Sequence, residues 1–140
     1  MSAEFEWLPI PDCPAHFGFF RLIHADVRAV ARTISCHQDI AADGAFSLGM
    51  LAEYETTLAQ APWLYRQLFW EAGIVGQVLY LEAEAAGVRG TGMGCYFDDV
   101  LHEVLGIKGI SVQSMYHFTI GTALSDDRLQ TLPPYAGRKA

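Results

Sequence analysis

The sequence predicts a mixed domain in which helices pack against a thin β-sheet. Helix-type and strand-type segments alternate along its 140 residues, which is the pattern of layered folds. The strongest helical segment covers residues 62–86, and β-type runs at 19–24, 45–54 and 115–121 would supply the sheet. The length is that of one domain, or of a piece of a larger one.

The composition predicts more apolar surface than one small core can hide. Apolar residues make up 51% of the chain and charged residues only 18%, which is rich in apolar side chains for so small a domain. We therefore expect an obligate partner, or a missing part of the same fold, to cover the excess.

The net charge, the apolar stretches, the N-terminus and the cysteines limit which partners and which cellular location are expected for the chain. A net charge of −7 leaves no basic patch for nucleic acid or an anionic membrane. Glu71, Glu82 and Glu84 interrupt the most apolar stretch, so we expect no membrane span. The N-terminus lacks the basic and apolar regions of a signal peptide. The cysteines are odd in number and form no CxxC pair, which predicts a reducing, cytoplasmic location.

The first third of the chain is expected to pass from irregular structure into the sheet. Prolines are spaced through residues 1–17, which disfavours regular structure, and residues 19–24 follow as a short strand. Asp26 is placed to cap a helix ending at Ile34, because the apolar residues between them recur every three or four positions. Residues 45–54 are the second expected strand, although the pattern alone also permits a helix there.

A long buried helix is predicted at residues 62–86. Pro62 opens it and Gly87 ends it. Its apolar side chains cover nearly the whole circumference, so we expect burial on all sides. Gly73 and Gly76 would let another backbone approach closely, at a propensity cost of about 1 kcal/mol each relative to alanine.

The glycine-rich segment after this helix is the most informative part of the chain. Gly90, Gly92 and Gly94 alternate with larger residues, and Asp98 and Asp99 then begin a short helix. Bare backbone at alternate positions can approach a flat or bulky group closely. We therefore expect main-chain N–H groups of this segment to contact a cofactor.

The alternate glycines also resemble a degenerate dinucleotide-binding turn, in which pyrophosphate lies on a helix N-terminus. Here Asp98 and Asp99 occupy that N-terminus and would repel a phosphate. The spacing is not GxGxxG, and no acidic ribose ligand follows roughly 20 residues later. The sequence therefore disfavours a dinucleotide-binding fold.

Several stretches carry a family resemblance. Residues 72–99 fit the pattern AGxxGQxLYLxAxAxGxxGTGxGCxFDD, with CHQDIAADGAFSLGMLAEY before it and SMYHFTIG and DRLQTLPPY after it. Over residues 19–135 the chain resembles the C-terminal half of nitroreductase-like flavin oxidoreductases, in particular the azoline-oxidising, streptolysin-type dehydrogenase branch. The resemblance implies an α+β fold of αβα layers, with a mixed or antiparallel sheet and a long buried central helix. It further implies a homodimer, FMN as cofactor and electron transfer through the flavin, with NAD(P)H or the substrate as donor.

The resemblance also assigns residues to the flavin site. Met93, Gly94 and Cys95 stand where the family offers main-chain groups to the flavin ring. Arg128 matches the late basic residue that binds the FMN phosphate. No residue is assigned a catalytic role, because the cofactor carries the chemistry and the protein orients it. The expected substrate is a small organic molecule or a peptide azoline.

The chain departs from the family in its first half. The early Arg-x-Ser element that holds the phosphate has no counterpart, and neither do the helices before the first strand. We expect an incomplete domain at residues 18–135, between an irregular segment at 1–17 and a tail at 136–140. A second copy or a partner chain would supply the rest. The alternative function is a non-catalytic dimerisation or partner module that keeps the fold core without the cofactor.

The cysteines have simpler interpretations than redox or metal chemistry. Cys95 has no basic neighbour in the sequence to lower the pKa of its thiol, so packing is favoured. Cys36 and His37 do not belong to a complete set of zinc ligands, and no metal site is predicted.

Two histidines also have ordinary structural explanations. His102 follows Asp98 by four positions and is expected to pair with it on one helix face. Tyr116 and His117 are neighbours on a strand, so one is expected to face inward and the other outward.

Overall fold

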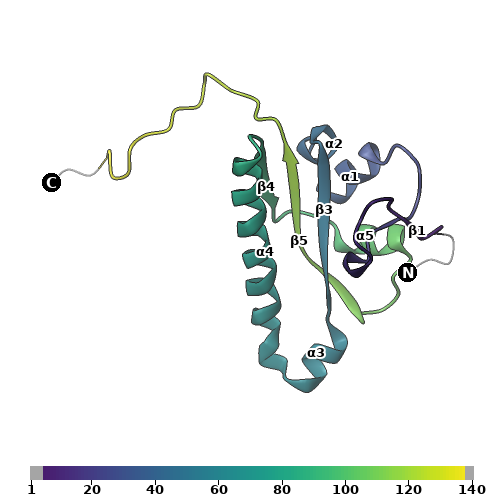
Figure 1. The fold of residues 1–140 in the computed structure, drawn as a ribbon. Coiled ribbons are helices and arrows are strands. Elements are labelled where there is room, and N and C mark those ends of the chain that lie inside the picture. The colour runs from purple at the N-terminus through teal and green to yellow at the C-terminus, as the bar shows by residue number, and fades with distance from the viewer. Residues whose placement is uncertain (1–4, 138–140) are drawn as a thin grey trace.

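The computed structural model describes residues 5–137, which form three layers around one small sheet (Figure 1). The sheet consists of β3 (Phe46–Glu53), β5 (Val112–Gly121) and β4 (Arg89–Met93), in that spatial order. Helix α4 (Tyr65–Ala85) covers one face, and shorter helices lie on the other (Figure 1). This is the α+β arrangement of αβα layers that the sequence predicts.

Strand β5 is the central strand, and it pairs antiparallel with both neighbours. Gly92 of β4 lies opposite Phe118, and Met93 lies opposite His117. The strands expected at residues 45–54 and 115–121 are confirmed as β3 and β5.

Strand β4 corrects the interpretation of the glycine segment. The sequence predicts no strand in this segment, whereas residues 89–93 form an edge strand of the sheet. Glycine is depleted in strands because it offers no side chain to pack, so propensity gives no signal for this strand.

Helix α4 begins and ends where the sequence predicts. The 3-10 turn η2 (Pro62–Leu64) leads into it, and Gly87, at φ 74°, follows its end. The expected burial on all sides is wrong for the single chain, because the sheet covers only one side of the helix. We call the other side the outward face of α4. Its exposed apolar side chains are Trp70, Ile74, Val78 and Leu81. No helix in residues 5–137 combines the length and apolarity needed to cross a membrane.

The helices on the opposite face of the sheet are short. Helix α1 (Arg28–Ile34) contacts α2 (Ile40–Asp43), which contacts β3 and β5, and α5 (Asp98–Leu105) also contacts β5. Helix α5 ends at Gly106, which adopts the left-handed conformation typical of glycine there. Helix α3 (Glu55–Gln60) connects β3 to η2.

Asp26 serves the start of α1, as the sequence predicts, although Val27 occupies the cap position itself. The carboxylate of Asp26 accepts a hydrogen bond from the main-chain N–H of Arg28 at 3.1 Å and binds its guanidinium at 2.6 Å. These contacts with Arg28 lower the pKa of Asp26 to about 2.

The N-terminal segment forms a separate strand pair. Strand β1 (Leu8–Pro9) pairs antiparallel with β2 (Phe20–Arg21), and the 3-10 turn η1 (Ala15–Phe17) lies between them in sequence. The strand expected at residues 19–24 is therefore only two residues long and lies outside the main sheet.

The core lies between α4 and the sheet. Phe118 of β5 is completely buried, at 0% exposure, and packs with Ala83 of α4 and Ile120. Partly buried apolar side chains surround this cluster: Met50, Leu79, Val88 and Tyr116.

After β5 the chain leaves the body of the domain. Residues 122–137 run away from the sheet (Figure 1). Their large apolar side chains are exposed: Leu124, Leu129, Leu132 and Tyr135. The segments expected at 1–17 and 136–140 extend beyond the described residues, at 1–4 and 138–140.

Candidate functional site

The alternate glycines of residues 90–94 have two different roles. A Cβ on Gly90 would lie 2.6 Å from the ring of Phe118, and a Cβ on Gly92 would lie 1.7 Å from the hydroxyl oxygen of Tyr116. Side chains in a close-packed interior cannot approach so closely. The backbone of Gly90 and Gly92 does lie against flat groups, as expected. These groups are aromatic rings of the neighbouring strand β5 rather than a cofactor.

Tyr116 lies between two glycines that are distant in sequence. A Cβ on Gly76 of α4 would lie 2.6 Å from its ring, so Gly92 and Gly76 together make room for this one side chain. The neighbour that approaches Gly76 is therefore a side chain of the same domain. Gly73 has nothing within 4 Å of a Cβ and remains open. The N–H of Gly92 donates a hydrogen bond to the hydroxyl oxygen of Tyr80 at 2.8 Å.

Gly94 differs from the other two glycines because its surroundings are open. A Cβ placed on it would meet no atom within 4 Å. Within residues 5–137, the main-chain N–H groups of Gly94 and Cys95 donate no hydrogen bond, and both residues are exposed. Met93 precedes them with its side chain buried, at 3% exposure. Two adjacent free donors beside open space fit the acceptor atoms along the edge of a flat ring such as that of FMN.

Side chains in the interior of the domain hold the segment after β4 in place. The imidazole of His117 is 4% exposed and stacks on the ring of Tyr96, with centroids 4.1 Å apart and planes at 10°. Its Nε2 lies 2.9 Å from the Oγ of Ser114. Burial lowers the pKa of His117, which keeps the ring neutral at pH 7. Burial also raises the pKa of Tyr96, and the nearby charge of Asp98 adds to that effect.

The predicted inward and outward alternation on β5 is wrong for His117 and Tyr116. The two side chains do point to opposite faces, but both faces of the central strand are covered. Helix α4 lies over Tyr116, and the segment after β4 lies over His117. His117 is buried and Tyr116 is only partly exposed.

The predicted pair between Asp98 and His102 does not form. Asp98 accepts a hydrogen bond from the side-chain amide of Gln113 at 2.8 Å. His102 points into the interior and is 8% exposed, and its Nε2 has no hydrogen-bond partner among the described residues.

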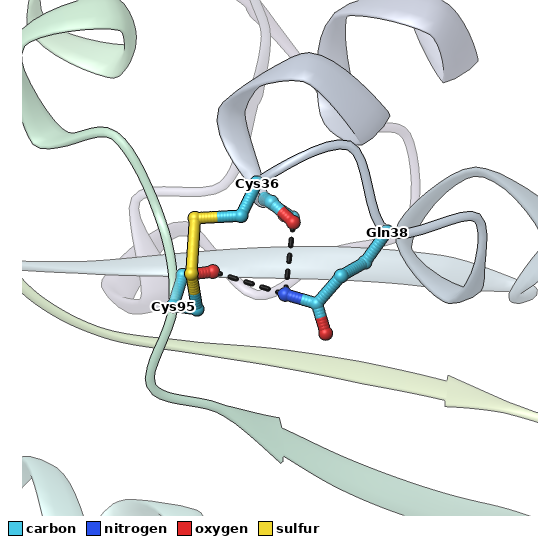
Figure 2. The surroundings of a disulfide bond; sticks show 4 residues. Cys36, Gln38 and Cys95 are labelled. Carbon is cyan, nitrogen blue, oxygen red and sulfur yellow. Dashed lines mark hydrogen bonds between the residues drawn. A yellow bond between two sulfur atoms is a disulfide. The ribbon is translucent and has the colours of Figure 1, made fainter.

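Cys36 and Cys95 form a disulfide, with Cα atoms 5.9 Å apart (Figure 2). The sequence-based expectations of a packing role for Cys95 and of thiols in their reduced form are therefore wrong for this structure. The pair forms because the chain after α1 runs beside the chain after β4, where the N–H of Phe97 donates to the carbonyl oxygen of Ile34 at 2.7 Å. Cys13 is the remaining free thiol.

Arg128 is not brought to the other predicted site residues. It lies on the C-terminal segment that leaves the body of the domain (Figure 1). Its side chain is 89% exposed, and its guanidinium binds the carboxylate of Asp126 at 2.6 Å. The structure therefore groups Met93, Gly94 and Cys95, and leaves Arg128 outside that group.

A cavity of about 550 Å³ lies at the other end of β4. None of the four predicted site residues lines it. Sequence reasoning had no signal for it, because its walls come from separate parts of the chain, including Ile40, Arg89, Thr119 and Leu124. Among residues 5–137, no group of His, Cys, Asp and Glu side chains is arranged to hold a metal ion.

Comparison with a solved structure identifies the fold. A crystal structure described as that of "a putative nitroreductase" from Anabaena variabilis ATCC 29413 aligns with this chain at a TM-score of 0.67 and 28% sequence identity, over 74% of the chain. The fold is nitroreductase-like. The alignment covers only 21% of that protein, so this nitroreductase-like chain spans about a fifth of its length. No family model and no curated protein matches the sequence.

Proposed function

We propose that this nitroreductase-like chain forms part of an FMN-dependent oxidoreductase and contacts the flavin ring through the segment after β4. The 28% identity to the Anabaena protein over 74% of the chain carries the proposal. The open surface at Gly94 and the free N–H groups of Gly94 and Cys95 support it. Bound FMN would supply electron or hydride transfer between a donor such as NAD(P)H and an acceptor.

The residues of this chain would position the flavin rather than react themselves. The N–H groups of Gly94 and Cys95 would donate to acceptor atoms of the ring. The buried side chain of Met93 and the stack of Tyr96 on His117 would fix these donors in place. No side chain of the chain is proposed as a general acid or base.

The substrate class rests on the sequence resemblance. The pattern across residues 72–99 favours the azoline-oxidising branch, so we propose a small organic molecule or a peptide azoline as substrate. The cytoplasmic location expected from the sequence belongs to the same proposal.

A second subunit would complete the assembly, either another copy or a partner chain. The outward face of α4 exposes four large apolar side chains, and Gly73 on the same helix leaves room for close approach. Soluble monomers seldom expose a large contiguous apolar patch. Arg128 lies on a segment that leaves the domain, and in such an assembly it would reach the FMN phosphate.

The test is the ratio of FMN to protein, read from the absorbance between roughly 350 and 500 nm, where flavins absorb. The 140-residue chain lacks the Arg-x-Ser element, so we expect it to purify largely colourless, with little NAD(P)H oxidation. Adding a chain that carries the missing half should restore colour and turnover. Gly94→Val should prevent this restoration without unfolding the domain, because a Cβ there meets no protein atom.

Two outcomes would contradict the proposal. Equal flavin affinity in the wild type and Gly94→Val would show that the flavin ring does not lie against this segment. An assembled complex that stays colourless at saturating FMN would favour the non-catalytic partner module instead.

A further inference from the structure

The Cys36–Cys95 disulfide joins the segment proposed to bind flavin to the turn that follows α1. Cys36 follows α1, and Cys95 lies between β4 and α5, 59 residues later (Figure 2). No other covalent bond ties the segment 94–97 to the helices beneath it within the described chain. The disulfide is therefore the covalent tether of this segment, which the stack of Tyr96 on His117 also holds.

Non-covalent contacts around the disulfide are few. The side-chain amide of Gln38 donates to the carbonyl oxygens of Cys95 at 3.1 Å and Ser35 at 2.9 Å (Figure 2). The N–H of Phe97 donates to Ile34, and the ring of Phe97 meets that of His37 edge to face, with centroids 5.9 Å apart. Most of these groups lie near the surface, where water competes for each hydrogen bond.

The backbone at Cys36 is also in an unusual conformation. Cys36 and His37 have φ values of 54° and 60°, a left-handed region that residues other than glycine seldom adopt. Two such residues in succession persist only where surrounding contacts enforce them. The disulfide is the covalent one among those contacts, so we expect this turn to relax and residues 94–97 to loosen when the bond breaks.

The disulfide is also accessible to thiols. Cys95 is exposed and Cys36 is partly exposed. Exposed disulfides are the ones that exchange readily with external thiols. A reducing compartment would therefore act on this bond directly.

We propose that the Cys36–Cys95 disulfide is a thiol-controlled latch on residues 94–97. The thiolate of a dithiol attacks the Sγ of Cys95, the disulfide breaks, and Cys36 leaves as a thiolate that takes up a proton. The second thiol of the reductant then attacks the mixed disulfide, and Cys95 leaves and is protonated in turn. Two electrons and two protons pass to the protein, and the reductant departs as its own disulfide. The role of the latch in flavin binding rests on the proposed function. The oxidised latch holds the N–H donors of Gly94 and Cys95 in place for the flavin, and reduction releases them.

The latch is tested first without flavin, with dithiothreitol as the dithiol. Thiol titration of the denatured protein should give one thiol in the oxidised chain, from Cys13, and three after reduction. Amide hydrogen exchange of the folded protein should show protection at Phe97 falling at least tenfold on reduction. Protection at Phe118, in the central strand, should stay the same. Cys36→Ser should match the reduced protein, and Cys13→Ser should match the oxidised wild type.

Each alternative outcome overturns the latch. Three titratable thiols after treatment with oxidised glutathione would show that the bond does not form. Unchanged exchange at Phe97 would show that the disulfide does not hold the segment. Equal loss of protection at Phe118 would make it a support of the whole fold rather than of one segment.

Titration with free FMN, with the missing half supplied, then separates the latch from the proposed function. Weaker FMN binding after reduction supports the link between them, and equal binding in both states overturns it. If exchange at Phe97 responds but FMN binds to neither state, even with the missing half supplied, the latch stands and the proposed function fails.

Discussion

The aromatic ring of Tyr96 stacks on the buried imidazole of His117, with ring centroids 4.1 Å apart. This contact joins the segment after β4 to the central strand of the sheet. Because the imidazole is removed from water, its charged form is disfavoured, and burial lowers the pKa of His117. The position of the segment after β4 is thus coupled to a neutral histidine.

The pKa shift of His117 predicts how stability changes with pH. Its folded-state pKa lies below the ordinary value of 6.5, so the unfolded chain takes up the proton first as the pH falls. The contribution of His117 to the unfolding free energy is complete above about pH 6.5 and is lost as the pH falls through the folded-state pKa. Denaturation curves between pH 7.5 and roughly 4.5 should show this loss, and His117→Asn should reduce it. His24→Asn, at an exposed histidine, serves as the control, and an equal reduction in both variants would contradict the assignment.

The different surroundings of Gly92 and Gly94 predict different effects of an alanine substitution on the unfolding free energy. Gly92→Ala should lower the unfolding free energy by about 1–3 kcal/mol, because its Cβ would overlap the hydroxyl oxygen of Tyr116. Gly94→Ala should leave it nearly unchanged, because a Cβ there meets nothing. Urea denaturation of the flavin-free chain measures both. Tyr116→Phe should recover part of the loss in the Gly92→Ala background, and no recovery would argue against the proposed overlap.

The outward face of α4 predicts self-association or capture of a partner. Ile74 lies on this face with 64% of its surface exposed. Ile74→Glu should weaken a dimer at least tenfold, because it places a charge in an apolar contact. Ile23→Glu is a matched control, since Ile23 is similarly exposed, at 57%, but lies near the N-terminal strand pair. Sedimentation at micromolar concentration reports the result, and a stable wild-type monomer would refute the prediction.

Arg128 and Arg28 provide a matched pair for testing the phosphate contact. Each guanidinium binds the carboxylate two positions earlier, at 2.6 Å. Arg128→Ala should weaken FMN binding to the assembled protein by about 1.5–3 kcal/mol, the value of a hydrogen bond to a charged group. Arg28→Ala removes the same kind of ion pair and should leave FMN binding unchanged. Equal effects of the two substitutions would show that Arg128 has no specific role.

The reduced and oxidised chains should also differ in overall stability. Closing a loop of this length restricts the unfolded chain, so the Cys36–Cys95 bond should raise the unfolding free energy by about 2–4 kcal/mol. Urea denaturation with and without dithiothreitol measures the difference. An identical midpoint in both conditions would show that the bond adds no constraint to the unfolded state.

Much of the fold follows from local sequence signals. The bounds of α4 and α5 agree with the structure because proline, aspartate and glycine mark helix ends through local backbone chemistry. Strand β3 is apolar enough to be expected in the sheet, although its leucine, methionine and alanine residues also permit a helix. Strand β4 lacks that composition, because its glycines are selected by the rings of Tyr116 and Phe118 across the sheet.

The parts of the candidate site that were missed depend on contacts between distant residues. The disulfide joins positions 59 residues apart, and no local pattern indicates that pairing. Asp98 pairs with Gln113 instead of His102 because the packing of α5 beside β5 places that amide within reach. The sequence treats the three alternate glycines alike, and only the structure distinguishes Gly94, which is open, from Gly90 and Gly92, which lie against aromatic rings.

The enclosure of Tyr116 between Gly76 and Gly92 has a mechanical consequence for the whole molecule. A sideways slide or rotation of α4 would drive a larger neighbouring side chain into the ring, so the helix has one permitted register on the sheet. The register of α4 on the sheet therefore sets where its outward face stands relative to β4, and a partner bound to that face would be held at a set distance from Gly94.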